Sequence, residues 1–315
     1  MDDCVDPALL TRFEAALGSL WHGDRLGLAV SGGSDSMALL VLAHRMLAGK
    51  FEVATVDHGL RSEAAEECAL VARACTERGI ECQILRVQVG EGNLQDRARA
   101  ARYSALGTWA QKRGLAAIAT AHHADDQAET LLMRLNRGSG LAGLAGIRSS
   151  ARIEGCAVPV IRPLLHFRRK ELRDIVERAE MPIVDDPSNR DESFDRVRLR
   201  RALESAEWID PLALSLSASH LEEAERALET VASRWWDREA QVSEASIVVP
   251  VAEATDIASM LVGRAIETLV GKALSRGEIA SFLKTLDRRG NIAGVLIERQ
   301  YDSFVCSPEP PRRAE

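Results

Sequence analysis

The chain has 315 residues, of which 46% are hydrophobic and 28% charged, a composition typical of a soluble globular protein with room for one large domain or two ordinary ones. It contains no run of about 18 apolar residues, which argues against a membrane-spanning helix. Its acidic start, MDDCVDPALL, lacks the basic region of a secretory signal, so we expect a cytoplasmic protein. The formal net charge of −7 does not exclude nucleic-acid binding, because that needs only a local basic surface.

The first half of the chain alternates between apolar runs and helical patterns. Asp6-Pro7 is typical of a helix N-cap and first helical residue, and it opens an amphipathic helix that runs to about Trp21. Apolar runs predict buried strands at 26–30, 53–56, 84–87 and 116–120. Helical patterns follow these strands at 35–48, 63–78, 93–112 and 126–136. We therefore expect an α/β fold, a doubly wound and mostly parallel sheet with ligands beyond the carboxyl ends of its strands.

The second half of the chain is less regular. In order, we expect a strand pair near 150–161, a helix at 167–180, an irregular acidic stretch at 182–195, a long helix or helix pair at 212–238, and two helices among short strands at 256–270 and 276–289. Trp208-Ile209-Asp210-Pro211 interrupts the chain between these parts. We therefore expect a core domain at 1–208 and a smaller, mostly helical domain at 209–315.

A glycine-rich loop joins the first expected strand to its helix. The loop is Ser31-Gly32-Gly33-Ser34-Asp35-Ser36. Such a turn gathers backbone N–H groups and the positive end of a helix at one point, which suits a phosphate, and an aspartate there is suited to hold Mg²⁺. Neither G-x-x-x-x-G-K-[ST] nor G-x-G-x-x-G occurs, so the two best-known nucleotide loops are absent. A tight turn capped by serines is the alternative interpretation.

Polar residues also follow the other strands. Asp57 ends a buried strand, where an unpaired carboxylate is costly without a ligand or cation, and Arg61 is suited to bind a phosphate or a neighbouring acid. Arg99, Arg102 and Tyr103 share one helix face, from which Arg102 can neutralise a phosphate or form a surface ion pair.

The segment His122-His123-Ala124-Asp125-Asp126-Gln127-Ala128-Glu129-Thr130 follows the fourth strand. Asp126 and Glu129 have the spacing of a helix capping box, and they are equally suited to hold Mg²⁺ or to accept protons. The adjacent histidines point in different directions, so we expect one of them at the site and favour His122 as a polar contact to the reacting centre.

Two arginine clusters are candidate nucleic-acid contacts, with a solvated helix face as the alternative for each. They contain Arg168, Arg169, Lys170 and Arg173, and Arg196, Arg198, Arg200 and Arg201. Cys68, Cys75 and Cys82 recur every seven residues, but no C-x-x-C pair exists, so we interpret them as structural residues and not as a metal-ligand set.

The loop S-G-G-x-D-S resembles the signature of the PP-loop ATP pyrophosphatases, which adenylate a carbonyl oxygen and release pyrophosphate. Further motifs, in this order and spacing, make residues 26 to about 201 similar to the tRNA(Ile)-lysidine synthetase family. They are Asp57-His58-Gly59-Leu60-Arg61, Asn93-Leu94-Gln95, Arg99 to Tyr103, the segment from His122 to Thr130, Arg137-Gly138-Ser139-Gly140, Arg162-Pro163-Leu164-Leu165 and Asp185-Asp186-Pro187-Ser188-Asn189.

The resemblance implies an enzyme that uses ATP and Mg²⁺ to adenylate the wobble cytidine of an isoleucine tRNA with a CAU anticodon, which free L-lysine then attacks. It implies ATP binding by Ser31, Gly32, Gly33, Ser34, Asp35, Ser36, Asp57 and Arg61. The implied catalytic residues are Asp35, Arg102, His122, Asp126 and Glu129, with Asp35 and Asp126 as Mg²⁺ ligands. The implied tRNA contacts are Arg168, Arg169, Arg196 and Arg198. A homodimer is compatible with a chain of this kind.

One motif departs from the family pattern. The family usually has an Arg-Asn pair followed by another arginine, where this chain has Arg196-Val197-Arg198. Three alternatives remain open: a PP-loop enzyme that inserts sulfur into a tRNA base, which usually needs site cysteines; an amidating synthetase, which would need an ammonia source; and a non-catalytic ATP-binding module.

Overall fold

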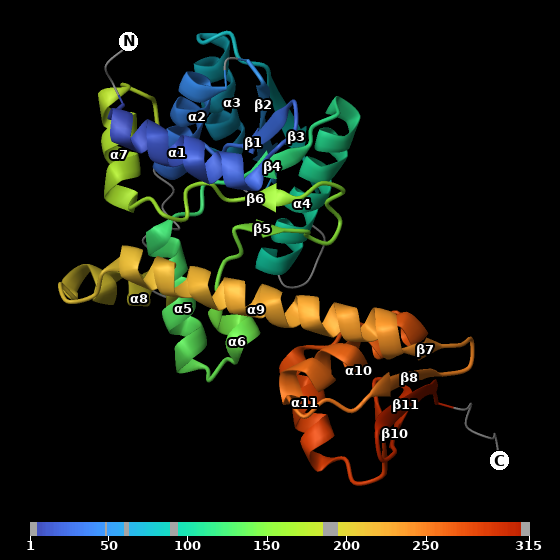
Figure 1. The fold of residues 1–315 in the computed structure, drawn as a ribbon. Helices are drawn as coiled ribbons and strands as arrows, with labels where there is room; N and C mark the ends of the chain where they lie inside the picture. Colours follow the sequence, from blue (N-terminus) through green and yellow to red (C-terminus); the bar gives the residue numbers. More distant parts are fainter. Residues whose placement is uncertain (1–4, 48, 60–62, 89–93, 185–194, 310–315) are drawn as a thin grey trace. The chain divides into compact units, whose positions relative to one another are not determined.

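The computed structural model describes residues 5–47, 49–59, 63–88, 94–184 and 195–309 (Figure 1). The expected loop residue Arg61, the motif at Asn93 and the motif at 185–189 lie outside these residues. The chain divides into two compact units, one of Met1–Arg137 and Gly146–Ala218 and the other of Gly138–Ala145 and Ser219–Glu315. Among the described helices, none combines the length and the apolar character that crossing a membrane requires.

The first unit is built on a six-stranded sheet. Its strands are β1 (Leu26–Ala29), β2 (Phe51–Asp57), β3 (Cys82–Arg86), β4 (Ala117–Ala119), β5 (Ser150–Ala151) and β6 (Val160–Ile161), in the order β3-β2-β1-β4-β6-β5. All neighbours pair in parallel except β5 and β6, the expected strand pair, which is antiparallel. The predicted, mostly parallel sheet is therefore confirmed. From β1 the chain first adds β2 and β3 on one side and then crosses over to add β4 on the other side of β1. The direction in which strands are added therefore reverses between β1 and β4.

Helices cover both faces of this sheet. They are α1 (Pro7–Leu20), α2 (Ser34–Met46), α3 (Glu63–Thr76) and α7 (Arg169–Arg178) on one face and α4 (Leu94–Arg113) on the other (Figure 1). Side chains of α1, α2, α3 and α7 share one core with the sheet, and α4 forms a second core on the other face. Two further helices of this unit, α5 (Ala124–Asn136) and α8 (Asp195–Ser205), contact each other. The expected N-cap is also present, since the Asp6 carboxylate accepts a hydrogen bond of 2.8 Å from the Ala8 N–H.

The cysteines at positions 68, 75 and 82 lie within this fold. Cys68 and Cys75 are buried in α3, and Cys82 begins β3. All three are free thiols. Among the described residues, no group of three or more His, Cys, Asp or Glu side chains is arranged to hold a metal ion.

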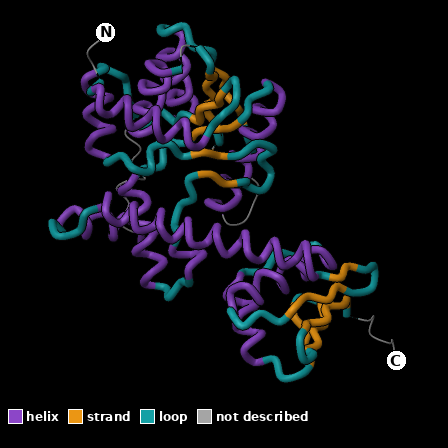
Figure 2. Tube along the Cα trace, viewed as in Figure 1, coloured by secondary structure: helices purple, strands orange, loops and turns teal. Residues whose placement is uncertain are grey.

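The second unit combines helices with an antiparallel sheet. Its helices are α6 (Leu141–Leu144), the part of α9 (Pro211–Glu239) that follows Ala218, α10 (Thr255–Val270) and α11 (Arg276–Thr285). Its strands are β7 (Gln241–Val242), β8 (Ile247–Pro250), β9 (Arg289–Ile292), β10 (Val295–Arg299) and β11 (Ser303–Pro308), in the order β7-β8-β11-β10-β9 (Figure 2). Leu261 and Ile266 of α10 pack with Val249, Ile297 and Phe304 of the sheet. The pattern at 212–238 thus forms a single helix, and the two expected later helices are confirmed.

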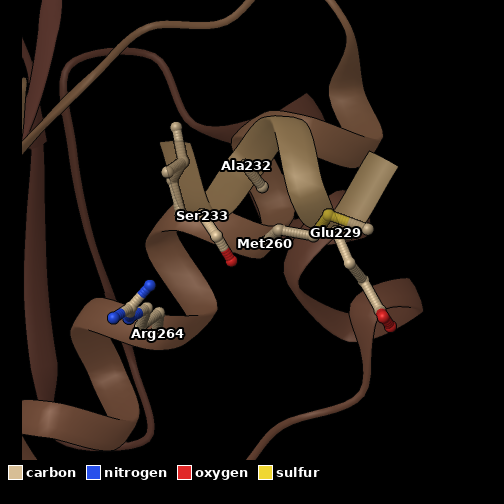
Figure 3. A pocket seen from close by; sticks show the side chains of 6 residues that line it. Glu229, Ala232, Ser233, Met260 and Arg264 are labelled. Carbon is tan, nitrogen blue, oxygen red and sulfur yellow. The ribbon is translucent and has the colours of Figure 1, made fainter. Parts of the chain in front are cut away.

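A small cavity of about 120 Å³ lies between α9 and α10 of the second unit (Figure 3). It is lined by Glu229, Ala232, Ser233, Met260, Leu261 and Arg264. None of these side chains belongs to the motifs that the sequence singled out, so this cavity is not the candidate site.

Close packing of α4 against β1 constrains one glycine. Gly27 lies in β1 between Leu26 and Leu28, whose side chains enter the opposite core. A Cβ atom at Gly27 would lie 2.7 Å from the ring of Trp109 and 3.1 Å from Leu115. The strand therefore tolerates no side chain on this face, and the indole ring fills the space.

We expect Gly27→Ala to lower the free energy of unfolding by about 1–3 kcal/mol, because the added methyl overpacks this contact. Gly18→Ala is the matched control, since Gly18 lies on the exposed face of α1, where an added Cβ would meet no atom within 4 Å. Urea unfolding of both variants checks this expectation. Equal stabilities for the two variants would contradict the packing argument.

Candidate active site

The carboxyl ends of β1 and β4 meet where the strand order reverses, which is the usual ligand position in such sheets. The glycine-rich loop leaves β1 here and leads into α2. Gly32 has φ +88°, a conformation that favours glycine, and its carbonyl accepts a hydrogen bond of 2.9 Å from the N–H of Val184. A Cβ at Gly32 would lie 3.1 Å from the Val184 side chain. Both the backbone conformation and the lack of space therefore favour glycine at this position.

Serine hydroxyls fix the shape of the loop. The Oγ of Ser36 accepts a hydrogen bond of 3.1 Å from the Ser31 N–H and donates one of 2.9 Å to the Gly33 carbonyl. Gly33 is the N-cap of α2, which begins with Ser34 and Asp35. The loop thus places its serines and Asp35 at the positive end of a helix, an arrangement that favours an anion.

His123 connects this loop to the start of α5. Its ring is fully buried, and its Nε2 lies 3.4 Å from Oδ2 of Asp35 and 3.5 Å from Oδ2 of Asp126. Its Nδ1 lies 3.4 Å from the N–H of Asp126, as expected for a helix cap, and the Asp126 carboxylate accepts a hydrogen bond of 3.2 Å from the His123 N–H.

The expected capping box of Asp126 and Glu129 is therefore wrong. The box consists of His123 and Asp126, because His123 has extended backbone and the helix begins at Ala124. Both histidines lie at this edge of the sheet, although we expected only one. Histidine is not among the usual N-cap residues, so the sequence pattern did not reveal it.

The charges of this cluster support one another. Burial alone lowers the pKa of His123, but the carboxylates of Asp35 and Asp126 outweigh burial and raise it. Burial alone raises the pKa of Asp126, but its contacts with His123, including the hydrogen bond from the His123 N–H, and the charge of Arg196 outweigh burial and lower that pKa. Asp126 therefore remains an ionised carboxylate.

Glu129 lies one helical turn further along α5 and is almost completely buried, with 1% of its side chain exposed. The Nε atoms of Arg196 and Arg200, both on α8, each lie 2.6 Å from one of its carboxylate oxygens, and Arg169 lies 3.8 Å away. Arg196 also pairs with Asp126 at 2.8 Å. These ion pairs fasten α8 to α5 and surround Glu129 with positive charge.

His122 lies on the other side of this cluster. Its Nδ1 forms a hydrogen bond of 3.0 Å with the Thr120 hydroxyl. Burial and the charges of Arg162, Arg102 and Arg196 lower its pKa to about 4, although Asp126 alone would raise it. His122 is therefore a neutral imidazole at physiological pH.

Arg102 and Asp57 reach the same edge of the sheet. Burial and then the charge of Arg102 lower the pKa of His58, which follows Asp57. The charge of Arg102 therefore acts on both His58 and His122. The Asp57 carboxylate accepts a hydrogen bond of 2.9 Å from the Gly59 N–H, so it shapes the turn after β2. Arg102 and Arg99 also stack on the ring of Tyr103.

The arginines that we expected to contact tRNA have different surroundings. Arg168 pairs with Asp125 at 3.5 Å and with Asp210 at 3.3 Å, and Arg169 and Arg196 reach Glu129. Arg198 is exposed on α8. Of the residues that the sequence predicted at the site, Asp35, His122, Asp126, Glu129 and Arg196 lie in one cluster at the start of α2 and α5.

Sequence reasoning did not assign roles to His123, Arg162 or Arg200 in this cluster. The arginines approach α5 from positions far along the chain, and no local pattern reveals such pairing.

The residues present fit a bound Mg²⁺. Asp35 and Asp126 supply oxygen ligands that face the same imidazole nitrogen of His123, so their carboxylates converge. Mg²⁺ is usually held by one or two carboxylates together with substrate phosphates and water. The two carboxylates beside the phosphate loop match this donor set.

A strand that ends in S-G-G-x-D-S at the reversal of a parallel sheet, without a Walker lysine, defines a PP-loop nucleotide-binding protein. The model of the PP-loop domain family matches residues 7–207. A tRNA(Ile)-lysidine synthase of Novosphingobium aromaticivorans is 43% identical over 97% of this chain and 95% of that relative. One of Zymomonas mobilis is 42% identical over 84% of this chain and 82% of that relative. The chain belongs to the tRNA(Ile)-lysidine synthase family.

Among solved structures, a U34-tRNA thiolase of Methanococcus maripaludis with its [4Fe-4S] cluster has a TM-score of 0.57 and 18% identity. The match covers 72% of this chain and 81% of that one. At this identity the likeness concerns the fold alone, and it agrees with the expected PP-loop architecture.

The neutral state of His122 predicts a specific loss of stability in acid. Between its folded pKa of about 4 and the ordinary value of 6.5, the unfolded chain binds a proton that the folded chain does not, so stability falls as pH falls through this window. From pH 7 to pH 5 this group alone removes about 2 kcal/mol.

We therefore expect His122→Gln to lose about 2 kcal/mol less than the parent chain between pH 7 and pH 5, measured by urea unfolding at both values. Parallel losses in the two proteins would show that His122 does not stay neutral in the fold.

Proposed function

We propose that this chain ligates free lysine to C2 of the wobble cytidine in an isoleucine tRNA with a CAU anticodon, forming lysidine through an adenylated tRNA and releasing AMP and pyrophosphate. The observation that carries this proposal is the 43% identity to a tRNA(Ile)-lysidine synthase over 97% of the chain. The geometry supports it, because the phosphate loop and the carboxylates of α5 meet at one edge of the sheet.

The loop is suited to release pyrophosphate. Its N–H groups, its serine hydroxyls and the positive end of α2 lie where negative charge would grow on a β,γ-pyrophosphate leaving group. Stabilisation that increases toward the transition state accelerates the reaction, whereas equal stabilisation of bound ATP does not. The loop has no lysine to reach the γ-phosphate, which fits transfer of AMP better than transfer of a phosphoryl group.

Asp35 and Asp126 are the residues that would hold Mg²⁺, which supplies positive charge to the phosphates when bound. Because the pKa of Asp126 is lowered, its carboxylate is a poor proton acceptor and is better suited to hold a cation. We assign Arg102, whose charge acts on both His58 and His122, the neutralisation of the α-phosphate during adenylation. His122, neutral and hydrogen-bonded to Thr120, can contact the reacting cytidine without adding charge.

Glu129 is the least accessible of the proposed catalytic residues. Its carboxylate oxygens already accept hydrogen bonds from Arg196 and Arg200, so in this structure it acts by holding these arginines beside Asp126. The exposed Arg198 is the proposed tRNA contact that is most open to solvent. Arg168, Arg169 and Arg196 already pair with carboxylates, so each would have to exchange a carboxylate for a tRNA phosphate. The expected domain at 209–315 is proposed as a further tRNA contact.

Two other parts of the proposal concern the whole protein. A cytoplasmic location would supply tRNA, ATP and lysine together. A homodimer is compatible with the fold, and sedimentation of the purified chain would test it directly.

The reaction is tested with ATP, Mg²⁺, labelled lysine and an isoleucine tRNA transcript with a CAU anticodon. We expect label in acid-precipitable tRNA, with one AMP and one pyrophosphate released per lysine. A methionine tRNA with the same anticodon is the negative control. Absence of labelled tRNA, or release of ADP and phosphate, would rule out this function.

We expect Asp35→Asn and Asp126→Asn each to lower the turnover number at least about 100-fold, because each removes a charge that faces the phosphates. Asp24→Asn is the control, since Asp24 is exposed at the opposite, amino end of β1. Melting temperatures are compared in parallel, because Asp126→Asn also loses its ion pair with Arg196. If either site variant keeps a near-normal rate, the assignment of these residues is wrong even though the function stands.

A further inference from the structure

His123 is the one ring in the described part of the cluster that contacts both the phosphate loop and α5. It is fully buried and follows β4, whereas Asp35 lies in the first turn of α2 after β1. The strands β1 and β4 are neighbours in the sheet but are separated along the chain by β2, β3 and three helices. A side chain that spans them links two parts of the site that fold from distant segments.

We propose that His123 is a positioning residue that holds the carboxylates of Asp35 and Asp126 in register across β1 and β4. This inference rests on the proposed function, and it concerns a residue that contacts the site carboxylates and not the reacting atoms.

The two ring nitrogens have separate tasks. Nδ1 lies 3.4 Å from the Asp126 N–H and accepts from it as the cap of α5, which places the ring hydrogen on Nε2. Nε2 lies 3.4 Å from Asp35 and 3.5 Å from Asp126 and is buried without an aligned hydrogen bond to either, so it contacts both carboxylates at ion-pair distance. The cap fixes the ring, and the fixed ring holds Nε2 beside both carboxylates.

The two carboxylates need a group of this kind between them. Like charges that converge on one place repel each other, and each would otherwise turn toward solvent or toward a different cation. Asp126 is already drawn toward α8 by Arg196 at 2.8 Å, while Asp35 has one third of its side chain exposed. The buried Nε2 beside both carboxylates would keep them near each other before ATP binds, which removes a cost of ordering them during the reaction.

Two substitutions separate the tasks of the ring. Asn reproduces the position of Nδ1 and is a good N-cap, but it is too short to reach Asp35. Gln reproduces the position of Nε2 and can donate to both carboxylates, but it lacks the cap. The variants are therefore His123→Asn, which keeps the cap and loses the bridge, and His123→Gln, which keeps the bridge and loses the cap.

The experiment measures lysidine formation, the melting temperature, and binding of the Mg²⁺ complex of α,β-methylene-ATP by calorimetry at low temperature. We expect His123→Asn to melt close to the parent chain, to lower the turnover number at least 10-fold and to weaken nucleotide binding several-fold, with an unchanged KM for tRNA. We expect His123→Gln to melt lower but to keep turnover within about 3-fold of the parent.

Asp6→Ala is the matched control for the cap alone. The Asp6 carboxylate caps α1 by accepting a hydrogen bond of 2.8 Å from the Ala8 N–H, and Asp6 has no role in the proposed site. Its loss should lower the melting temperature and leave turnover and nucleotide binding unchanged.

Two results would overturn the proposal. One is a His123→Asn variant with the parent's turnover and nucleotide affinity. The other is a His123→Gln variant as inactive as His123→Asn at a temperature where both are folded. In either case the parent chain would still make lysidine, whereas a parent chain that makes none would refute the function itself.

Discussion

The pairing of β4 with β1 is the constraint on which the rest of the site depends. These strands are not consecutive, yet they lie side by side with their carboxyl ends at one edge. The loop after β1 and the His-His-Ala-Asp-Asp segment after β4 therefore meet without any direct link along the chain. The phosphate loop, the carboxylates and the neutral His122 become parts of one site only through this sheet topology.

Charge neutralisation inside the cluster is the second requirement. Glu129 is 1% exposed, and a buried carboxylate of this kind is costly unless charged partners surround it. Arg196 and Arg200 lie four positions apart on α8, and Asp126 and Glu129 lie three apart on α5, so one face of each helix meets the other. A chain with a net charge of −7 can thus still gather arginines at one site, here Arg169, Arg196 and Arg200 around Glu129, and need not be basic overall.

Local patterns were sufficient to predict the sheet and the loop. Apolar runs identified the interior strands β1, β2 and β4, since buried parallel strands are continuously hydrophobic, and Gly32-Gly33 between a strand and a helix identified the phosphate loop. The run at 84–87 also identified a strand, but the expectation that it is buried was wrong, because β3 lies at the edge of the sheet and Ile84 is 41% exposed. The register at the start of α5 could not be predicted in this way, because the choice of His123 as the cap depends on its backbone conformation and on Asp35 from another helix. The partners of Glu129 lie roughly 70 positions away, and sequence spacing carries no sign of that contact.

The burial of Glu129 also affects how the enzyme tolerates salt. Mobile ions largely screen exposed charges that lie more than about 8–10 Å apart at physiological ionic strength, but they screen a close ion pair with a buried acidic partner much less. Protein contacts to tRNA phosphates weaken steeply as salt rises, since binding releases counterions. The link between α5 and α8 should therefore weaken less with salt than tRNA association does. The ion pairs between α5 and α8 can therefore stay formed while tRNA binds and dissociates.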